Sequence, residues 1–289
     1  MAKILLRIVI QGLWLLSYPF PGYISRKLAT FPRTPRRLKK VIPASEFLRR
    51  AERSTLTWQG EQLEVFRWRH PKEESSITPQ GKTILLVHGW EHNVRFLQAM
   101  AEELFHEGFN VLAMNGPAHG NSQRKRTDIF DYGKAFGKLM EEFGPVDAAV
   151  AHSFGGSALL LYMGQHQPES KLPLVLIATP MDYAKVTRQF ADQLILPDRL
   201  YHLLVKGLEA YYQLPIQKMN MHLAEEFAAH NPMLYLQDPD DQVVKRNNGM
   251  DAFKHFKNCQ VQEVHNVGHN RILNAATTLQ KTKYFMVNL

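Results

Sequence analysis

The stretch Val150-Ala151-His152-Ser153-Phe154-Gly155-Gly156 decides the fold, because it joins an apolar run to a glycine pair through an isolated serine. Such a pattern is typical of a sharp strand-to-helix turn that pushes the serine hydroxyl out above a sheet. The turn requires small residues two before and two after the serine, and Ala151 and Gly155 are small. Glycine is more usual at the position of Ala151, so the sequence departs from the pattern there by one methyl group.

Three further segments place a loop directly after an apolar run or before a helix. Thr83–Val87 ends in His88-Gly89-Trp90, a loop that can offer a backbone N–H group. The acidic loop Asp238-Pro239-Asp240-Asp241 follows a short apolar run, and Val267-Gly268-His269 precedes a predicted final helix. Together with the serine turn, these loops contain the residue types that acyl transfer requires.

The order of the candidate residues discriminates between classes of serine enzyme. Ser153, Asp241 and His269 are separated by 88 (241 − 153) and 28 (269 − 241) residues. Chymotrypsin-like and subtilisin-like proteases have other orders of serine, acid and histidine, so both are disfavoured. Asp238 and Asp240 stand in the same loop and are alternative candidates for the acid, but the Gln-Val-Val that follows Asp241 favours Asp241.

Each candidate residue has a defined chemical role. A serine hydroxyl is a poor nucleophile at neutral pH, so Ser153 needs a neighbouring base, and a neutral imidazole such as that of His269 suits this task. Asp241 would hold the other ring N–H group and stabilise the imidazolium that forms. The backbone N–H groups of Phe154 and Trp90 would bind the developing oxyanion, each contributing roughly 3 kcal/mol.

These motifs resemble those of bacterial serine hydrolases of the α/β-hydrolase superfamily, of the esterase and lipase type, from about Leu56 to the C-terminus. The matching pieces are the serine turn, His88-Gly89-Trp90, Gly116-Pro117-Ala118-His119-Gly120-Asn121-Ser122, Asp241-Gln242-Val243-Val244 and Gly268-His269. Asn115 stands where the family often has aspartate, in a loop that is mostly structural. The resemblance implies a serine carboxylesterase-like enzyme that cleaves esters or thioesters with an apolar acyl group through an acyl-serine intermediate.

A second class of function stays open on the same fold. An acyltransferase would pass the acyl group to an alcohol instead of water, and a non-catalytic relative would only bind a ligand. The intact set of serine, aspartate and histidine favours an enzyme. Epoxide hydrolases and dehalogenases are disfavoured because they use a carboxylate nucleophile where this chain has Ser153.

Apolar runs alternate with helical patterns along the chain, which predicts βαβ units and a mostly parallel sheet flanked by helices. Ser54–Trp58 and Leu63–Trp68, on either side of Gln59-Gly60, predict an opening hairpin. The later strands are expected at Thr83–Val87, Asn110–Met114, Ala148–His152, Leu174–Ala178, Met233–Gln237 and Val261–Val264. Helices are expected near Arg95–Glu107, Tyr132–Phe143, Gly155–Gly164, Asn247–Phe256 and Asn270–Val287.

The expected organisation is an N-terminal helical arm at residues 1–50 and an α/β-hydrolase domain at residues 51–289, with a helical cap insertion at about 181–231. An unstructured connection of about 50 residues is uncommon in a compact domain. Leucine and aromatic residues recur at near-helical spacing between Phe190 and Tyr212, which predicts lid helices. Most of these residues are expected to pack on the domain, and some to face the substrate.

Composition agrees with an enzyme that needs neither metal nor cofactor. The chain has 289 residues, of which 45% are hydrophobic, enough for a large core. Cys259 is the single cysteine, so an internal disulfide and a cysteine-cluster metal site are both excluded. His88, Glu91 and His92 do not follow the His-Glu-x-x-His order of zinc proteases. The expected partner is a small-molecule ester or thioester.

The net positive charge of the chain is concentrated in the N-terminal arm. Residues 1–50 contain eleven Lys or Arg and one acid, Glu46, a net charge of +10. The remainder carries 35 − 11 = 24 bases and 27 − 1 = 26 acids, a net charge of −2. Nucleic-acid binding explains this poorly, because the basic residues adjoin a leucine-rich stretch and no recognition motif is present.

The start of the arm predicts a helix that is apolar except for one stripe, formed by Lys3, Arg7 and Gln11. Arg7 interrupts the apolar core that a secretory signal needs, and the stretch before Pro19 is too short to span a bilayer. The helix therefore docks on the hydrolase body, which is slightly favoured, or residues 1–40 contact an anionic membrane. The basic residues that would help the second alternative are Arg33, Arg36, Arg37, Lys39 and Lys40. We expect a cytoplasmic protein, peripheral at the inner membrane in the second case.

Overall fold

The computed structural model describes residues 2–36, 42–70 and 81–289 and divides the chain into two compact units. The sheet unit contains Pro35–Met181 and Met221–Leu289. The arm–insertion unit contains Met1–Thr34 and Asp182–Asn220. Residues 35–36 and 42–50, which the sequence groups with the arm, thus belong to the sheet unit. Arg37, Lys39 and Lys40 lie outside the described residues.

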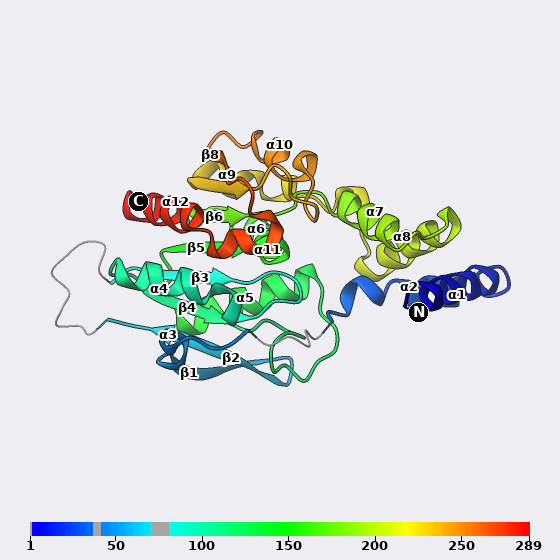
Figure 1. The fold of residues 1–289 in the computed structure, drawn as a ribbon, viewed down its shortest axis with the longest axis horizontal. Coiled ribbons are helices and arrows are strands. Elements are labelled where there is room, and N and C mark those ends of the chain that lie inside the picture. Colours follow the sequence, from blue (N-terminus) through cyan, green and yellow to red (C-terminus); the bar gives the residue numbers. More distant parts are fainter. Residues whose placement is uncertain (1, 37–41, 71–80) are drawn as a thin grey trace. The chain divides into compact units, whose positions relative to one another are not determined.

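An eight-stranded sheet with the order β1-β2-β4-β3-β5-β6-β7-β8 forms the centre of the sheet unit (Figure 1). The antiparallel hairpin of β1 and β2 joins antiparallel to β4, and every pair from β4 to β8 is parallel. The predicted fold class, a mostly parallel sheet flanked by helices, is confirmed. The strands are β1 Glu52–Trp58, β2 Glu61–Trp68, β3 Thr83–Val87, β4 Asn110–Met114, β5 Ala148–His152, β6 Leu174–Ile177, β7 Met233–Gln237 and β8 Cys259–Glu263.

Both faces of β3 to β7 are buried, which explains why these strands are apolar runs without polar alternation, whereas the edge strand β8 is partly exposed and carries polar residues. Ile84 and Leu86 of β3 belong to one core layer, together with Leu104 and Met286 from two helices on that face. Val87 points to the opposite face, where it contacts the helix that begins at Ser153. The carboxyl ends of β3, β5, β7 and β8 lie at one edge of the sheet and lead into the candidate loops.

Helices follow most strands, and most of the expected helices are present. Those of the sheet unit are α3 Glu46–Arg49, α4 Gln98–His106, α5 Ile129–Phe143, α6 Ser153–His166, α9 Glu225–His230, α10 Met250–Phe253, α11 Gly268–Arg271 and α12 Ala276–Val287. The single helix expected over Asn270–Val287 is wrong. The extended backbone of Ala275 (φ −72°, ψ 130°) separates α11 and its 3-10 extension from α12, while Ile272 and Leu273 insert into the core.

Two glycines allow α5 and α6 to approach closely. A Cβ atom at Gly133 would overlap the carbonyl oxygen of Ala158, and one at Gly137 would overlap the ring of Tyr162. Only glycine fits at these two positions, because the backbone of α6 and the ring of Tyr162 occupy the space that a side chain would need. Because α6 begins with Ser153, the packing of α5 on α6 also stabilises the serine turn.

The arm–insertion unit is helical, as the sequence predicts for both of its segments. Its helices are α1 Ala2–Leu16, α2 Pro21–Leu28, α7 Tyr183–Gln193 and α8 Asp198–Tyr212. Ser25 Oγ of α2 donates to the carbonyl oxygen of Leu203 at 2.9 Å, and Arg199 Nε donates to Ser17 Oγ at 2.8 Å. The guanidinium of Arg33 lies 3.3 Å above the ring centroid of Tyr211. The arm is therefore docked on the insertion through α8.

Close packing of α2 on α8 depends on Gly207, and this yields a prediction. A Cβ atom at Gly207 would overlap the carbonyl oxygen of Ser25 and lie 3.0 Å from Ala29 Cβ, whereas a Cβ at Gly12 of α1 would contact nothing within 4 Å. We expect Gly207→Ala to separate α2 from α8 and to speed amide hydrogen exchange in α2. Gly12→Ala is the matched control and should stabilise α1 by up to about 1 kcal/mol. Equal exchange in both variants would contradict this account of the packing.

Candidate active site

The serine turn has the geometry that the sequence predicts. Ser153 is the first residue of α6 and has φ +52°, a left-handed backbone that is uncommon for a residue with a side chain. A Cβ atom at Gly155 would overlap the carbonyl oxygen of His88, and one at Gly156 would overlap Thr179 Oγ1. Ala151, at the position where glycine is more usual, is fully buried in β5, and its methyl group is accommodated.

The structure brings Ser153, His269 and Asp241 together in one hydrogen-bonded chain. His269 Nε2 lies 2.9 Å from Ser153 Oγ, and His269 Nδ1 lies 2.7 Å from Asp241 Oδ2. The carboxylate accepts from the imidazole, so the ring proton lies on Nδ1 and Nε2 is free to accept the serine proton. The side chain of His269 is 9% exposed and that of Asp241 is fully buried. A hydroxyl, an imidazole and a carboxylate are thus in contact, and little of each side chain is exposed to solvent.

The three aspartates of the acidic loop occupy different positions. The second oxygen of Asp241, Oδ1, accepts from the backbone N–H groups of Val243 at 2.7 Å and Val244 at 3.0 Å. These bonds fix the carboxylate that faces His269. Asp240 is exposed to solvent. Of the three, the structure places only Asp241 against the imidazole.

Asp238 holds the backbone of the histidine loop, a role that the sequence did not indicate. Its Oδ2 atom accepts from the N–H groups of Val267 at 2.7 Å and Gly268 at 2.6 Å. These backbone hydrogen bonds outweigh the effect of burial and hold the pKa of Asp238 below its usual value, although burial by itself raises it. The sequence shows an aspartate in this loop, but its hydrogen bond to Val267 joins positions 29 residues apart and has no local signature.

The proposed oxyanion donors lie on two neighbouring turns. Phe154 is the second residue of α6, where a backbone N–H group has no acceptor within the helix. Trp90 lies in the turn after β3, which the bond from His92 N to Gly89 O closes at 3.2 Å. The rings of Trp90 and Phe154 pack edge to face at 4.8 Å. Gly89 makes this approach feasible, because a Cβ there would lie 3.1 Å from Ser153 Cβ.

Buried histidines surround the hydrogen-bonded chain and stabilise its loops. His88 Nε2 accepts from Gly116 N at 3.0 Å, and His119 Nε2 accepts from Glu91 N at 3.0 Å. His152 Nε2 donates to the backbone carbonyl oxygen of His269 at 3.0 Å. Burial lowers the pKa of His88 and of His152 well below the usual value. These imidazoles are therefore neutral, and they bind loop backbone through defined tautomers.

Asn115, the departure from the family pattern, uses both ends of its amide. Its Oδ1 atom accepts from Val94 N at 2.9 Å, and its Nδ2 atom donates to Glu64 Oε2 at 2.7 Å. An aspartate could accept the first bond but could not donate the second, and it would face the carboxylate of Glu64. The asparagine is thus matched to Glu64 of β2, and no part of this contact reaches the serine turn.

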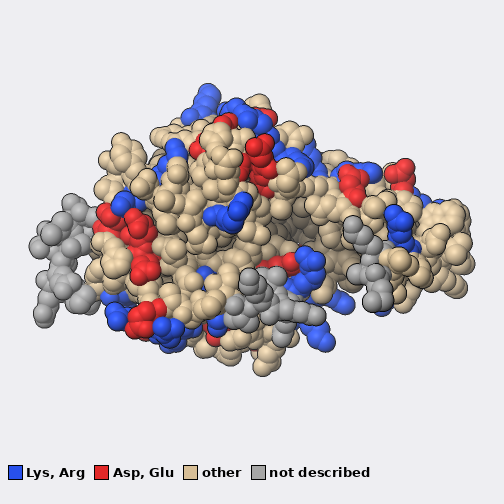
Figure 2. Space-filling view, in the orientation of Figure 1, with Lys and Arg blue, Asp and Glu red and all other residues tan. Residues whose placement is uncertain are grey.

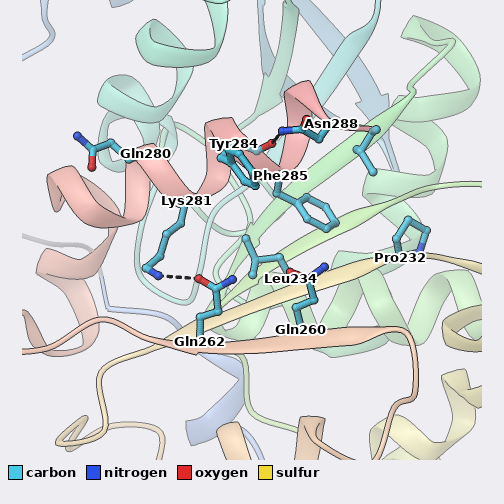
Figure 3. A pocket seen from close by; sticks show the side chains of 10 residues that line it. Pro232, Leu234, Gln260, Gln262, Gln280, Lys281, Tyr284, Phe285 and Asn288 are labelled. Atoms are coloured by element: carbon cyan, nitrogen blue, oxygen red, sulfur yellow. Dashed lines mark hydrogen bonds between the residues drawn. The ribbon is translucent and has the colours of Figure 1, made fainter.

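A cavity of about 670 Å³ lies away from this site, between α12 and the strands β7 and β8 (Figure 3). Its lining begins at Pro232 and Leu234, at the amino end of β7, while Asp241 follows the carboxyl end of the same strand. Lys281 Nζ donates to Gln262 Oε1 at 2.6 Å across its wall. None of the three hydrogen-bonded residues lines this cavity, so the candidate site is assigned from their geometry.

Within residues 2–36, 42–70 and 81–289, no group of three or more His, Cys, Asp or Glu side chains is arranged to hold a metal ion. His92, which the sequence pairs with His88 as a candidate ligand, stacks on the ring of Phe96 at 3.8 Å.

The buried histidines predict a loss of stability in mild acid. Burial lowers the pKa of His92 and of His119 to about 4, whereas a histidine in the unfolded chain titrates near 6.5. Between these values the unfolded state binds more protons, so the free energy of unfolding decreases as pH falls from about 6.5 to about 4. We expect each of the two histidines to contribute about 2 kcal/mol of this loss between pH 7 and pH 5, measured by urea unfolding.

The variant His92→Phe tests this assignment, because phenylalanine keeps the stacking on Phe96 but does not titrate. Its unfolding free energy should depend less steeply on pH than that of the wild type over the same range. Identical slopes in the two proteins would contradict the assignment.

Comparison with known proteins agrees with the architecture. Residues 82–198 match the family model described as the α/β-hydrolase fold. A search of curated proteins found no match. An esterase of Pyrococcus furiosus is 16% identical with a TM-score of 0.60, covering 88% of this chain and 96% of that one. Est1E of Butyrivibrio proteoclasticus, solved with ferulic acid bound, is 16% identical with a TM-score of 0.60, covering 81% and 98%.

A third similar structure also spans the arm. It is a membrane phospholipase A described as a bacterial virulence factor, 17% identical with a TM-score of 0.55, and the match covers 99% of this chain and 98% of that one. Likeness at this level of identity concerns the fold. The matched segment, the strand order and the shared architecture show that this chain is a protein of the α/β-hydrolase fold, similar to solved esterases and lipases.

Proposed function

We propose that the chain is a serine hydrolase that cleaves carboxylic esters or thioesters with an apolar acyl group through an acyl-serine intermediate. The observation that carries this proposal is the imidazole of His269, which lies within hydrogen-bond distance of both Ser153 Oγ and Asp241 Oδ2. The fold and its esterase and lipase neighbours support hydrolase activity in general. The finer assignment, a serine carboxylesterase-like enzyme, rests on this geometry.

In the first half of the reaction, Ser153 Oγ attacks the carbonyl carbon while its proton passes to His269 Nε2. The carbonyl oxygen gains negative charge and accepts hydrogen bonds from the N–H groups of Trp90 and Phe154. Asp241 stabilises the imidazolium without taking its proton. The bond to the alcohol or thiol then breaks, and the leaving group departs with the proton from Nε2.

In the second half, water replaces the leaving group. It gives a proton to His269 Nε2 and attacks the acyl carbon, and the carbon–oxygen bond to Ser153 breaks as the serine regains its proton. The products are a carboxylic acid and the free enzyme. The neutral, hydrogen-bonded surroundings of His269, including His152 on its backbone carbonyl, hold the ring in place through both halves.

The proposed preference for an apolar acyl group rests on the apolar side chains beside Ser153 and in the insertion. The indole of Trp90 packs against Phe154 beside the serine and would form one wall of the acyl pocket. The insertion at about 181–231 is rich in leucine and aromatic residues, of which Phe190 and Leu194 are only half-buried. One methylene in such a pocket is worth about 1–3 kcal/mol, so selectivity for chain length should be broad.

The alternative functions are acyl transfer and ligand binding without catalysis. Transfer would use the same acyl-serine and differ only in the acceptor of the second half. Ligand binding would leave the aligned hydroxyl, imidazole and carboxylate without a task, and the strained φ of Ser153 without a compensating role. The geometry therefore favours an acyl-serine enzyme, and hydrolysis needs only water as the acceptor.

Covalent labelling tests the nucleophile. A fluorophosphonate probe should label the wild type on Ser153 and leave Ser153→Ala unlabelled, since the Ser153 hydroxyl lies 2.9 Å from the His269 imidazole that would activate it. Turnover should be measured with p-nitrophenyl esters and acyl-CoA thioesters of graded chain length, with and without an added alcohol as acceptor. Equal labelling of both proteins would overturn the assignment, and an acyl-alcohol as the main product would favour transfer.

A second prediction concerns the acid. Asp241→Asn should lower kcat by about three to four orders of magnitude, because the amide can present an N–H group to His269 Nδ1 and favour the wrong tautomer. Asp240→Asn is the matched control in the same loop and should change kcat little, since Asp240 is exposed. A larger loss for the Asp240 variant would move the role to that residue.

We also propose a place for this reaction: in the cytoplasm, with residues 1–40 in peripheral contact with the anionic inner membrane. The support is the net charge of +10 over residues 1–50, together with the leucine-rich start of the chain. The similar structure that spans the arm is itself named a membrane phospholipase. None of the helices in the described ranges combines the length and the apolar character needed to cross a membrane.

A further inference from the structure

We propose that one face of α1 is a membrane-insertion surface that seats on an anionic lipid bilayer. This inference rests on the proposed peripheral location and names the surface responsible. We call this surface the outer face of α1. It consists of Ile4, Leu5, Ile8, Val9, Leu15 and Leu16, whose side chains are 47–65% exposed.

The outer face is a continuous apolar stripe. At 100° per residue, Ile4, Ile8 and Leu15 lie within about 40° of one another around the helix. The opposite side of α1 carries Ile10 and Trp14, which are only partly exposed. Apart from the stripe of Lys3, Arg7 and Gln11, α1 is apolar, and so broad an apolar surface is normally buried or in contact with lipid, yet the outer face is exposed to solvent. In Figure 2 the surface of α1, found by its place in Figure 1, is mostly tan, with blue basic side chains beside it.

Exposed aromatic side chains come directly after the outer face in the sequence. Tyr18, Phe20 and Tyr23 are 53–58% exposed, in the turn after α1 and at the start of α2. Tyrosine and tryptophan are enriched at the level of lipid headgroups, because one end of the side chain is apolar and the other is polar, while Phe20 adds apolar surface beside them. The ring of Tyr18 is held in place by Trp14, at 5.2 Å edge to face, and by the guanidinium of Arg199, at 4.1 Å.

Basic side chains accompany the apolar stripe. Arg7 is exposed on α1, and Arg26 and Lys27 are exposed at the end of α2. Glu46 is the single acid in residues 1–50, so no acidic residue stands among them in α1 or α2. An apolar face with basic residues beside it fits a helix that lies in the plane of an anionic membrane.

A second copy of the chain is the competing occupant of this face. In a two-fold dimer the same patch would meet itself, and two arms of net charge +10 over residues 1–50 would be brought together. Like charges oppose that contact, whereas anionic headgroups complement it. Charge therefore favours the bilayer over self-association.

The arm cannot simply be deleted to test the proposal. Residues Ile24 and Leu28 of α2 are buried, and Ser25 bonds to the backbone of α8, so removal of the arm would expose apolar surface on the insertion. Substitutions on the outer face avoid this problem, because the side chains of Ile4, Ile8 and Leu15 are 60–65% exposed. Glutamine is a suitable replacement, since its helix propensity is close to that of leucine.

The test measures flotation of the full chain with vesicles of phosphatidylglycerol and phosphatidylcholine at low salt. The triple variant Ile4→Gln, Ile8→Gln, Leu15→Gln should partition into these vesicles at least about tenfold less than the wild type. The matched control is Tyr284→Gln, Val287→Gln, Leu289→Gln, three exposed apolar residues at the C-terminus, and it should bind as the wild type does. The variant Arg7→Gln, Arg26→Gln, Lys27→Gln should bind about fivefold less for each charge removed, and added salt should weaken binding further.

Several results would overturn the proposal: failure of the wild type to float at low salt, equal flotation of the outer-face variant, or equal flotation with pure phosphatidylcholine vesicles. A wild type that sediments as a dimer, and becomes a monomer in the outer-face variant without any vesicle binding, would assign the face to a second copy. Labelling by the fluorophosphonate probe, measured without lipid, should be unchanged in every variant. Loss of labelling in all proteins would count against the proposed hydrolase and not against the membrane surface.

Discussion

The left-handed backbone of Ser153 is the constraint on which the rest of the site depends. A φ of +52° turns the chain so sharply from β5 into α6 that the first turn of the helix lies against the loop after β3. That contact leaves no room for a side chain at Gly155, beside the carbonyl oxygen of His88, or at Gly89, beside His152 and Ser153. The same contact points the serine hydroxyl at His269 and brings Phe154 beside Trp90. Strain at one residue thus aligns the proposed nucleophile with its base and with both proposed oxyanion donors.

Neutral buried histidines hold the loops around this turn. His88, His119 and His152 each bond to backbone of a different loop, and burial keeps the pKa of each below its ordinary value. A neutral imidazole has one donor nitrogen and one acceptor nitrogen, so a single ring can join two buried chain segments. Asp238 acts in a similar way with charge, because its carboxylate accepts two N–H groups from the histidine loop. The proposed base is therefore positioned by groups that take no part in the proton transfer.

The arm and the insertion together form a separate unit, and this unit contains the basic residues of α1 and α2. Bonds from Ser25 and Arg199 connect α1 and α2 with α8, and the guanidinium of Arg33 stacks on Tyr211. The sequence presents docking on the hydrolase body and contact with a membrane as alternatives, but the observed docking on the insertion is compatible with membrane contact. α2 uses its buried side to pack on α8, while the outer face of α1 remains exposed. The proposed membrane surface is thus attached to the helices that we propose to influence substrate preference.

The sequence by itself determined the class of fold and the position of almost every parallel strand, because buried strands are short apolar runs between turn residues. It also predicted which side chains would meet, and the structure brings Ser153, Asp241 and His269 together, while their catalytic roles stay a proposal. Tertiary structure decided what depends on contacts between distant segments. The anchoring of the histidine loop by Asp238, the amide bonds of Asn115 and the packing of Gly207 on Ser25 have no local pattern. The break between α11 and α12 also depends on tertiary contacts, because the burial of Ile272 and Leu273 in the core overrides the helical propensity of this segment.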